Sequence, residues 1–163
     1  MKNILKIALS LLILLPAVSC EKQNTGSEEI VYLDVNANNI SGDWKLDSWE
    51  GGQMADADVA VYLRFIRKNT RYEMYSNIGS MEFVRRTGDF VITADDNLGA
   101  VLSGSYDYTL GETWNHDYVV TLVERNGAAE MTLTAVDDAD NVCTYVRCSI
   151  PEEITGAFPP VGE

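Results

Sequence analysis

Short runs in which apolar and polar residues alternate constrain the fold of this chain more than any other feature of its sequence. In residues 59–66 (VAVYLRFI), Val61, Leu63 and Phe65 occupy alternate positions, with Tyr62 and Arg64 between them. Side chains of a strand point alternately to the two faces of a sheet, so this period of two predicts a half-buried strand. The same pattern, rich in Val, Thr and Tyr, recurs at residues 42–49, 71–76, 81–83, 89–94, 99–108, 117–124, 129–136 and 141–150.

The segments between these runs are short and contain typical turn-forming residues. They are residues 68–70, 86–89, 95–99, 125–127 and 137–141. Connections of this length join neighbouring strands antiparallel, and the pair Asn126-Gly127 is typical of a tight hairpin. We therefore expect an all-β domain of about eight strands, with a helical turn at 54–60 as the only ambiguous segment. An up-and-down barrel is favoured because it removes the sheet edges, and a β-sandwich is the alternative.

The first twenty residues differ from the rest of the chain. Lys2 and Lys6 precede an apolar run that is broken by one serine, and small residues then lead to Cys20. This order predicts a secretory signal whose apolar run is too short to span a bilayer. Because it ends at a cysteine, it resembles a bacterial lipoprotein signal, although an ordinary cleaved signal is the alternative. The resemblance implies that residues 1–19 are removed and that Cys20 receives a diacylglycerol and an N-acyl chain, which together suffice for stable anchoring.

These features divide the chain into four parts. We expect a signal peptide at 1–19, a lipidated flexible tether at 20–40, a barrel domain at 41–151 and a C-terminal tail at 152–163. Residues 21–27 (EKQNTGS) are polar, as a flexible tether requires. The expected location is the bacterial cell envelope, with export and lipid anchoring in the outer membrane and with the leaflet left open.

Charge and cysteine content exclude several classes of partner and bond. The chain has a net charge of −13, and removal of residues 1–19 leaves 10 basic and 25 acidic residues. So acidic a protein is unsuited to binding nucleic acid or a membrane through a basic patch. Beyond Cys20, only Cys143 and Cys148 remain. In one strand they would face opposite sides, roughly 16 Å apart, and could not bond to each other.

The tripeptide at 42–44 (Gly-Asp-Trp) opens the first strand expected in the barrel. With Gly42 and Trp44, it resembles the Gly-x-Trp signature of lipocalins and related calycin barrels. In that family the tryptophan closes one end of the barrel, and a basic side chain of the last strand packs on its face as a cation–π contact. The matching residue here is Arg147. Residues 117–118 (Asp-Tyr) weakly echo a second family motif, while a third motif and a helix after the last strand are not evident. The resemblance covers residues 40–150 and implies a lipocalin-like barrel of the kind found in small bacterial lipoproteins.

No group of residues predicts catalysis, a cofactor or a metal site. His116 is the only histidine, which excludes a typical His-rich zinc site, and no nucleophile-elbow sequence supports a Ser-His-Asp triad. Residues 34–38 (DVNAN) begin like a calcium loop, but Asn39 and Lys45 occupy the positions of the required glycine and glutamate. The acidic stretch 137–141 is explained by turns in which Asp and Asn bind their own backbone, with loose calcium binding as the alternative.

Aromatic residues give the best sign of a ligand, although they do not identify the residues that bind it. They are Tyr62, Phe65, Tyr72, Tyr75, Phe83, Phe90, Tyr106, Tyr108, Trp114, Tyr118 and Tyr145. A barrel of eight strands either fills with side chains or holds one small molecule. We expect a non-enzymatic, membrane-anchored lipocalin-like protein that binds a small, mainly apolar ligand, with the barrel mouth over the membrane surface. The alternative is a filled barrel that contacts an envelope protein or polymer.

Overall fold

The computed structural model describes residues 29–52, 59–108 and 112–160. In these ranges the strands are β1 (Ile30–Tyr32), β2 (Gly42–Glu50), β3 (Val61–Ile66), β4 (Arg71–Ser76), β5 (Val84–Asp95), β6 (Gly99–Tyr106), β7 (Tyr118–Arg125), β8 (Ala128–Ala135) and β9 (Val142–Arg147). The helical segments are α1 (Ala37–Ile40), the 3₁₀ turn η1 (Arg67–Asn69) and α2 (Glu152–Thr155). The signal at 1–19, Cys20 and most of the ambiguous turn at 54–60 lie outside the described residues.

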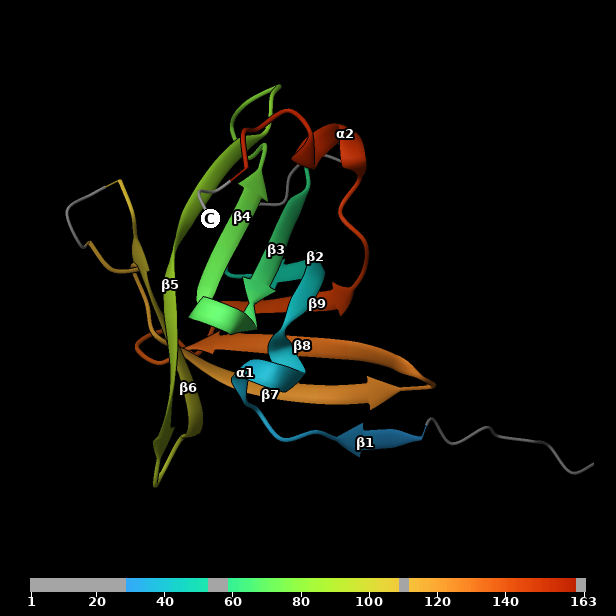
Figure 1. Ribbon diagram of the computed structural model, residues 1–163. Coiled ribbons are helices and arrows are strands. Elements are labelled where there is room, and N and C mark those ends of the chain that lie inside the picture. Colours follow the sequence, from blue (N-terminus) through green and yellow to red (C-terminus); the bar gives the residue numbers. More distant parts are fainter. Residues whose placement is uncertain (1–28, 53–58, 109–111, 161–163) are drawn as a thin grey trace, which may run out of the picture.

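Strands β2 to β9 form a closed antiparallel barrel (Figure 1). Each strand pairs with the next along the chain, and β9 returns to pair with β2, where Trp44 lies opposite Arg147. The prediction of an all-β up-and-down barrel is confirmed, and the sandwich alternative is wrong. The ends of the strands define two openings. One opening lies at the starts of β2 and β4 and the ends of β3 and β9. The other lies at the ends of β2 and β4 and the starts of β3 and β9, and we call it the mouth.

The barrel is weakest where β6 meets β7. Only two residue pairs join these strands directly, Val101 with Val119 and Leu102 with Tyr118. Toward the mouth, the segment around Thr113 pairs with β6 in place of β7. On the side away from the mouth, β1 pairs with the last three residues of β7, Val123 to Arg125. Together with α1, β1 shows that the second half of the segment assigned to the tether, 20–40, is folded against the barrel.

Strand β5 is longer than the sequence indicates. The turn predicted at 86–89 is wrong, because these residues continue β5 and pair with β4, and the strand predicted at 81–83 is replaced by turns and bends. Gly88 marks a close approach between strands, since a Cβ atom there would lie 1.7 Å from the Ser105 carbonyl oxygen. Glycine inside a strand often has this role.

The sequence predicted no definite helix, but two single helical turns flank the barrel. Asn36 caps α1, because its side chain accepts hydrogen bonds from the backbone N–H groups of Asn38 and Asn39. This cap accounts for the calcium-like spacing at 34–38. At the other end of the chain, Ile154 of α2 is buried, so the described part of the segment assigned to a tail also packs onto the barrel.

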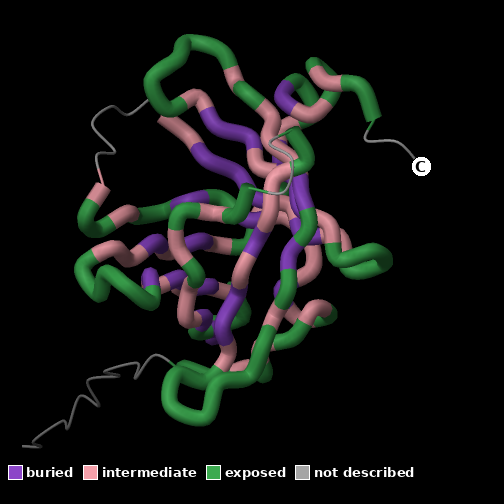
Figure 2. Tube along the Cα trace, turned by 90° about the vertical axis from the view of Figure 1, so that its left-hand side faces the viewer, coloured by how far each residue is buried: buried purple, intermediate pink, exposed green. Residues whose placement is uncertain are grey.

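Buried side chains form one cluster inside the barrel and a smaller one outside it. Figure 2 shows buried and exposed positions following one another along the strands. The most deeply buried members of the inner cluster are Ile40, Trp44, Phe65, Tyr72, Phe90, Leu102, Leu122 and Met131. The outer cluster consists of Tyr62 and Tyr75 packed against Ile150 and Ile154. Each large apolar side chain buried in this way contributes about 1.5–3 kcal/mol. The inner cluster is concentrated at the opening opposite the mouth.

Candidate functional site

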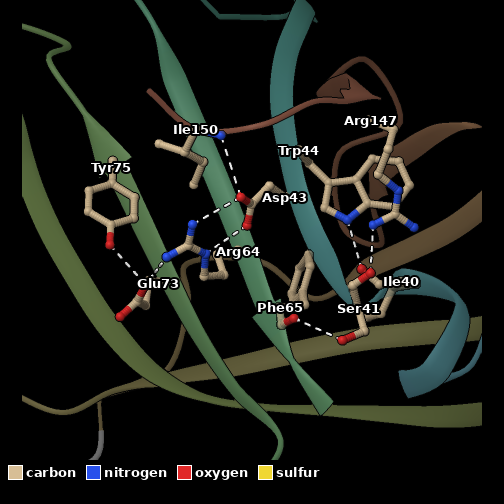
Figure 3. Close-up of polar contacts among 10 residues, drawn as sticks. All are labelled: Ile40, Ser41, Asp43, Trp44, Arg64, Phe65, Glu73, Tyr75, Arg147 and Ile150. Atoms are coloured by element: carbon tan, nitrogen blue, oxygen red, sulfur yellow. Dashed lines mark hydrogen bonds and ion pairs between the residues drawn. The ribbon is translucent and has the colours of Figure 1, made fainter. Parts of the chain in front are cut away.

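Trp44 and Arg147 seal the opening opposite the mouth (Figure 3). The indole of Trp44 is fully buried and donates a hydrogen bond of 2.7 Å from Nε1 to the Ile40 carbonyl oxygen. The guanidinium of Arg147 lies 3.8 Å from the centre of the indole ring. It also donates bonds of 2.6 Å and 2.8 Å to the carbonyl oxygens of Ser41 and Asn39. The contact expected between Trp44 and Arg147 is therefore present.

Gly42 makes room for this arginine. Its φ angle is +111°, and a Cβ atom there would lie 2.7 Å from Nη1 of Arg147. A side chain at this position would both strain the backbone and collide with the guanidinium. The glycine and the tryptophan of the tripeptide at 42–44 thus serve the same closure.

Asp43, between them, belongs to a polar network on the outer face of β2 to β4 (Figure 3). Its carboxylate accepts two hydrogen bonds from Arg64, of 2.7 Å and 2.9 Å, and one of 3.4 Å from the backbone N–H of Ile150. Buried Glu73 accepts a bond of 2.8 Å from the Tyr75 hydroxyl and pairs with Arg64 at 3.5 Å. Burial, followed by the bond to Glu73, raises the pKa of Tyr75 to about 12. Every charged group in this network is paired, so we assign it a structural role.

The mouth half of the barrel is hollow. A cavity of about 250 Å³ is lined by Trp49, Leu63, Met74, Tyr106, Trp114, Asn115, His116, Tyr118, Leu133, Asn141, Cys143 and Tyr145. A neighbouring compartment of about 280 Å³ is lined by Leu46, Trp49, Val61, Met74, Ser76, Ile78, Arg86, Tyr118, Cys143 and Tyr145. Because five residues line both, we treat the two compartments as one site and call it the mouth cavity.

Three aromatic side chains form the boundary between the hollow and the filled half. The Trp114 ring meets the buried Tyr72 ring edge-on at 5.0 Å, and Tyr106 meets Tyr72 at 6.4 Å. Trp114 can lie this deep because residue 104 is a glycine, where a Cβ atom would be 2.2 Å from the indole. Burial raises the pKa of Tyr72, whose hydroxyl has no hydrogen-bond partner in the described part of the chain.

Polar groups of the mouth cavity are few and mostly uncharged. Trp49 donates a hydrogen bond of 2.9 Å from Nε1 to the Asn141 side chain. Burial raises the pKa of Tyr118 to about 12 and that of Cys143 to about 11, and it also raises the pKa of Tyr145. These three groups therefore stay protonated at neutral pH. Among the described residues, none forms a hydrogen bond with the hydroxyl of Tyr118 or Tyr145, so both hydroxyls can serve a ligand.

His116 lies at the rim of the cavity. Its Nδ1 is 2.6 Å from Oδ1 of Asp137, and this bond holds the pKa of Asp137 below its ordinary value. The pair fixes the orientation of the imidazole ring. Within the described ranges, no serine hydroxyl completes a catalytic triad with it, and no group of three His, Cys, Asp or Glu side chains is arranged to hold a metal ion.

Arg86 is the residue that the sequence analysis missed. It lies in β5 opposite Met74, faces inward and is half-buried. Among the described lining residues of the mouth cavity, it is the one Asp, Glu, Lys or Arg side chain. No carboxylate of the described residues lies within 4 Å of it. The period of two runs on through residues 84–90, and this signal could have placed Arg86 on the inner face.

The two cysteines beyond Cys20 lie on opposite sides of the wall, as predicted. Cys143 lines the mouth cavity and Cys148 packs against the outer cluster, and both are free thiols. In the described ranges, no helix is both long enough and apolar enough to cross a membrane. No protein-family model matches this chain, and comparisons with curated proteins and with solved structures found no match.

Proposed function

We propose that this protein is a lipid-anchored, lipocalin-like carrier that binds a small, mainly apolar molecule in the mouth cavity and does not convert it chemically. The hollow mouth half of the barrel is the observation that carries this proposal. Its walls are mostly apolar and aromatic, with a few polar groups, which is the usual composition of small-molecule sites. A volume of about 250 Å³ suits a molecule the size of one or two rings or of a short chain.

Two further observations support the lipocalin-like and lipid-anchored parts of the proposal. The closure made by Gly42, Trp44 and Arg147 matches the arrangement that the Gly-x-Trp resemblance implies. The proposed anchor rests on the sequence alone, with the signal at 1–19 followed by Cys20. Replacing Cys20 with Ser should abolish labelling by a radioactive fatty acid and release the protein from the membrane fraction. Unchanged labelling would contradict the anchor.

Two observations favour the carrier over its alternatives. A filled scaffold would pack both halves of the barrel to the density of a protein interior. An enzyme would need an activated nucleophile or base, but the thiol of Cys143 has a raised pKa and is a poor nucleophile. His116 is bonded to Asp137 with no nucleophile beside it among the described residues.

Native mass spectrometry of the protein purified from its own cells tests the carrier. We expect a small mass that stays with the folded chain and leaves on denaturation. Replacing Cys143 with Phe should fill part of the cavity and remove that mass. The matched control is Thr144→Phe, which adds the same ring to the neighbouring, outward-facing position of β9. A folded wild-type protein that carries nothing, and takes up no apolar compound, would overturn the proposal.

A further inference from the structure

We infer that the molecule bound in the mouth cavity carries an anionic group, with a carboxylate as the simplest case, and that Arg86 binds this group. The inference rests on the proposed carrier function and narrows it to a chemical class. Its basis is an inward-facing arginine that has an apolar chamber beside it and no hydrogen-bond or ion-pair partner in the described part of the chain.

Comparison with the neighbouring arginine shows how unusual this position is. Arg85 faces outward, where it donates a hydrogen bond of 2.5 Å to the Pro159 carbonyl oxygen and lies 5.3 Å from the centre of the Phe158 ring. Each of the other described arginines likewise has a hydrogen-bond partner: Arg64, Arg67, Arg71, Arg125 and Arg147. Arg86 is half-buried and has none within the described ranges, in a chain with 25 acidic residues.

A half-buried guanidinium without a partner has given up part of its water and gains no hydrogen bond in return. An anion that enters the cavity would accept hydrogen bonds from the guanidinium in place of the missing water. Arginine is well suited to this, since its planar fork binds a carboxylate through two parallel hydrogen bonds. The position of Arg86 is therefore better explained by a ligand than by the fold.

The groups near Arg86 favour an anion as well. Ser76 is buried, and its hydroxyl oxygen already accepts a bond of 3.2 Å from the backbone N–H of Ile78, so its proton is free to donate. Tyr118 and Tyr145 line the same compartment with protonated hydroxyls. Of the residues that the structure describes, no carboxylate lines either compartment. The acidic groups elsewhere act through water, where screening limits their reach to about 8 Å at physiological salt.

Geometry thus predicts an amphipathic ligand with a defined orientation. Its anionic group would lie at Arg86 and Ser76, and its apolar body would extend between Met74, Tyr118 and Trp114. The rings on this wall favour a flat or slender apolar body.

Paired probes of matched shape test the inference. We would titrate the purified protein by calorimetry with 2-naphthoate and its neutral counterpart 2-naphthalenemethanol, and with octanoate and 1-octanol. In each pair the wild type should bind the carboxylate about tenfold or more tighter, as expected for hydrogen bonds to a charged group. Arg86→Gln should abolish this preference while leaving the affinity for the alcohol unchanged, and Arg86→Lys should retain part of it. Lys68→Gln, which removes the same charge from an exposed site away from the mouth, should bind like the wild type.

The outcomes separate this inference from the proposed function. If carboxylate and alcohol bind equally well to the wild type, or if the preference survives in Arg86→Gln, the anionic ligand is wrong but the carrier stands. If no probe binds to a protein whose circular dichroism and melting temperature show a native fold, both are overturned. Should Arg86→Gln fail to fold, Arg86→Met and the salt dependence of wild-type carboxylate binding provide the same comparison.

Discussion

Arg147 and Arg86 lie at opposite ends of the same barrel, and they differ in their exposure and in their hydrogen-bond partners. Arg147 is exposed, yet it packs on Trp44 and donates hydrogen bonds to two carbonyl oxygens. Arg86 is more deeply placed but has no hydrogen-bond partner among the described residues. The first arginine completes a closure that the chain makes from its own parts. The guanidinium N–H groups of the second arginine lie beside a cavity and donate to no described residue.

The two halves of the barrel differ in the same way. Around Trp44 the interior is filled by large apolar side chains with almost no exposed surface. At the mouth, side chains of similar size line a chamber instead of filling it. A rigid, fully packed half can hold the strands in place so that the other half can stay hollow. The packed interior and the cavity thus lie at different ends of one sheet.

Removing Trp44 should break the closed half and give the largest effect. We expect Trp44→Ala to lower the free energy of unfolding by about 3–5 kcal/mol, the usual loss for a buried aromatic side chain. Trp49→Ala, in the half-exposed wall of the mouth cavity, should lower it by less than half as much. Urea denaturation followed by circular dichroism measures both. Equal losses would mean that the two halves contribute alike to stability.

Cys143 reports on the hollow half through its reactivity. Burial raises the pKa of its thiol to about 11, so at pH 8 only about one molecule in a thousand carries the reactive thiolate. An ordinary thiol with a pKa of about 8.5 is about one-quarter ionised. Alkylation of Cys143 by iodoacetamide should therefore be on the order of a few hundredfold slower in the folded protein than in urea, and it should accelerate about tenfold for each unit of pH up to about 11. Peptide mass mapping distinguishes Cys143 from Cys148 and Cys20. Equal rates in the folded and the denatured protein would contradict a buried position for this thiol.

Substitutions of the two arginines should have the smallest effects on stability, but they compare the two residues directly. Arg147→Gln should lower the free energy of unfolding by about 1–2 kcal/mol, because it removes a cation–π contact and hydrogen bonds from a charged donor. Arg86→Gln should change it by less than about 0.5 kcal/mol, since no hydrogen bond or ion pair within the described residues is lost. Thermal and urea unfolding of both variants give this comparison. A larger loss for Arg86→Gln would reveal a structural role for Arg86 and weaken the assignment to a ligand.

Much of this architecture was predictable from local pattern. Alternating residues located eight of the nine described strands, and the residues at 42–44 together with Arg147 indicated the closure. Strand β1 was missed because three exposed residues show no alternation that could be recognised. Its existence depends on the free edge of β7, which only the assembled barrel presents.

The mouth cavity was less predictable, because its parts are brought together by tertiary contacts. Gly88 within 86–89 reads as a turn in the sequence, and only the position of β6 shows that it marks a close approach between strands. Because the sequence predicted a turn at 86–89, Arg86 was not assigned to a strand or to its inner face. His116 and Asp137 are 21 residues apart, and no local spacing predicts that they meet.

The place where β1 begins has a consequence for the proposed anchor. Ile30 pairs with Arg125 at the end of β7 that is far from the mouth, and in Figure 1 β1 lies on the opposite side of the barrel from the β6–β7 connection. If Cys20 carries lipid, the nine residues from 21 to 29, at most about 30 Å long when extended, attach the barrel to the bilayer by its base. The mouth then lies at the end of the barrel away from this attachment point. With the attachment point and the opening at opposite ends of the barrel, a proposed ligand would have a route to the cavity that does not pass the tether.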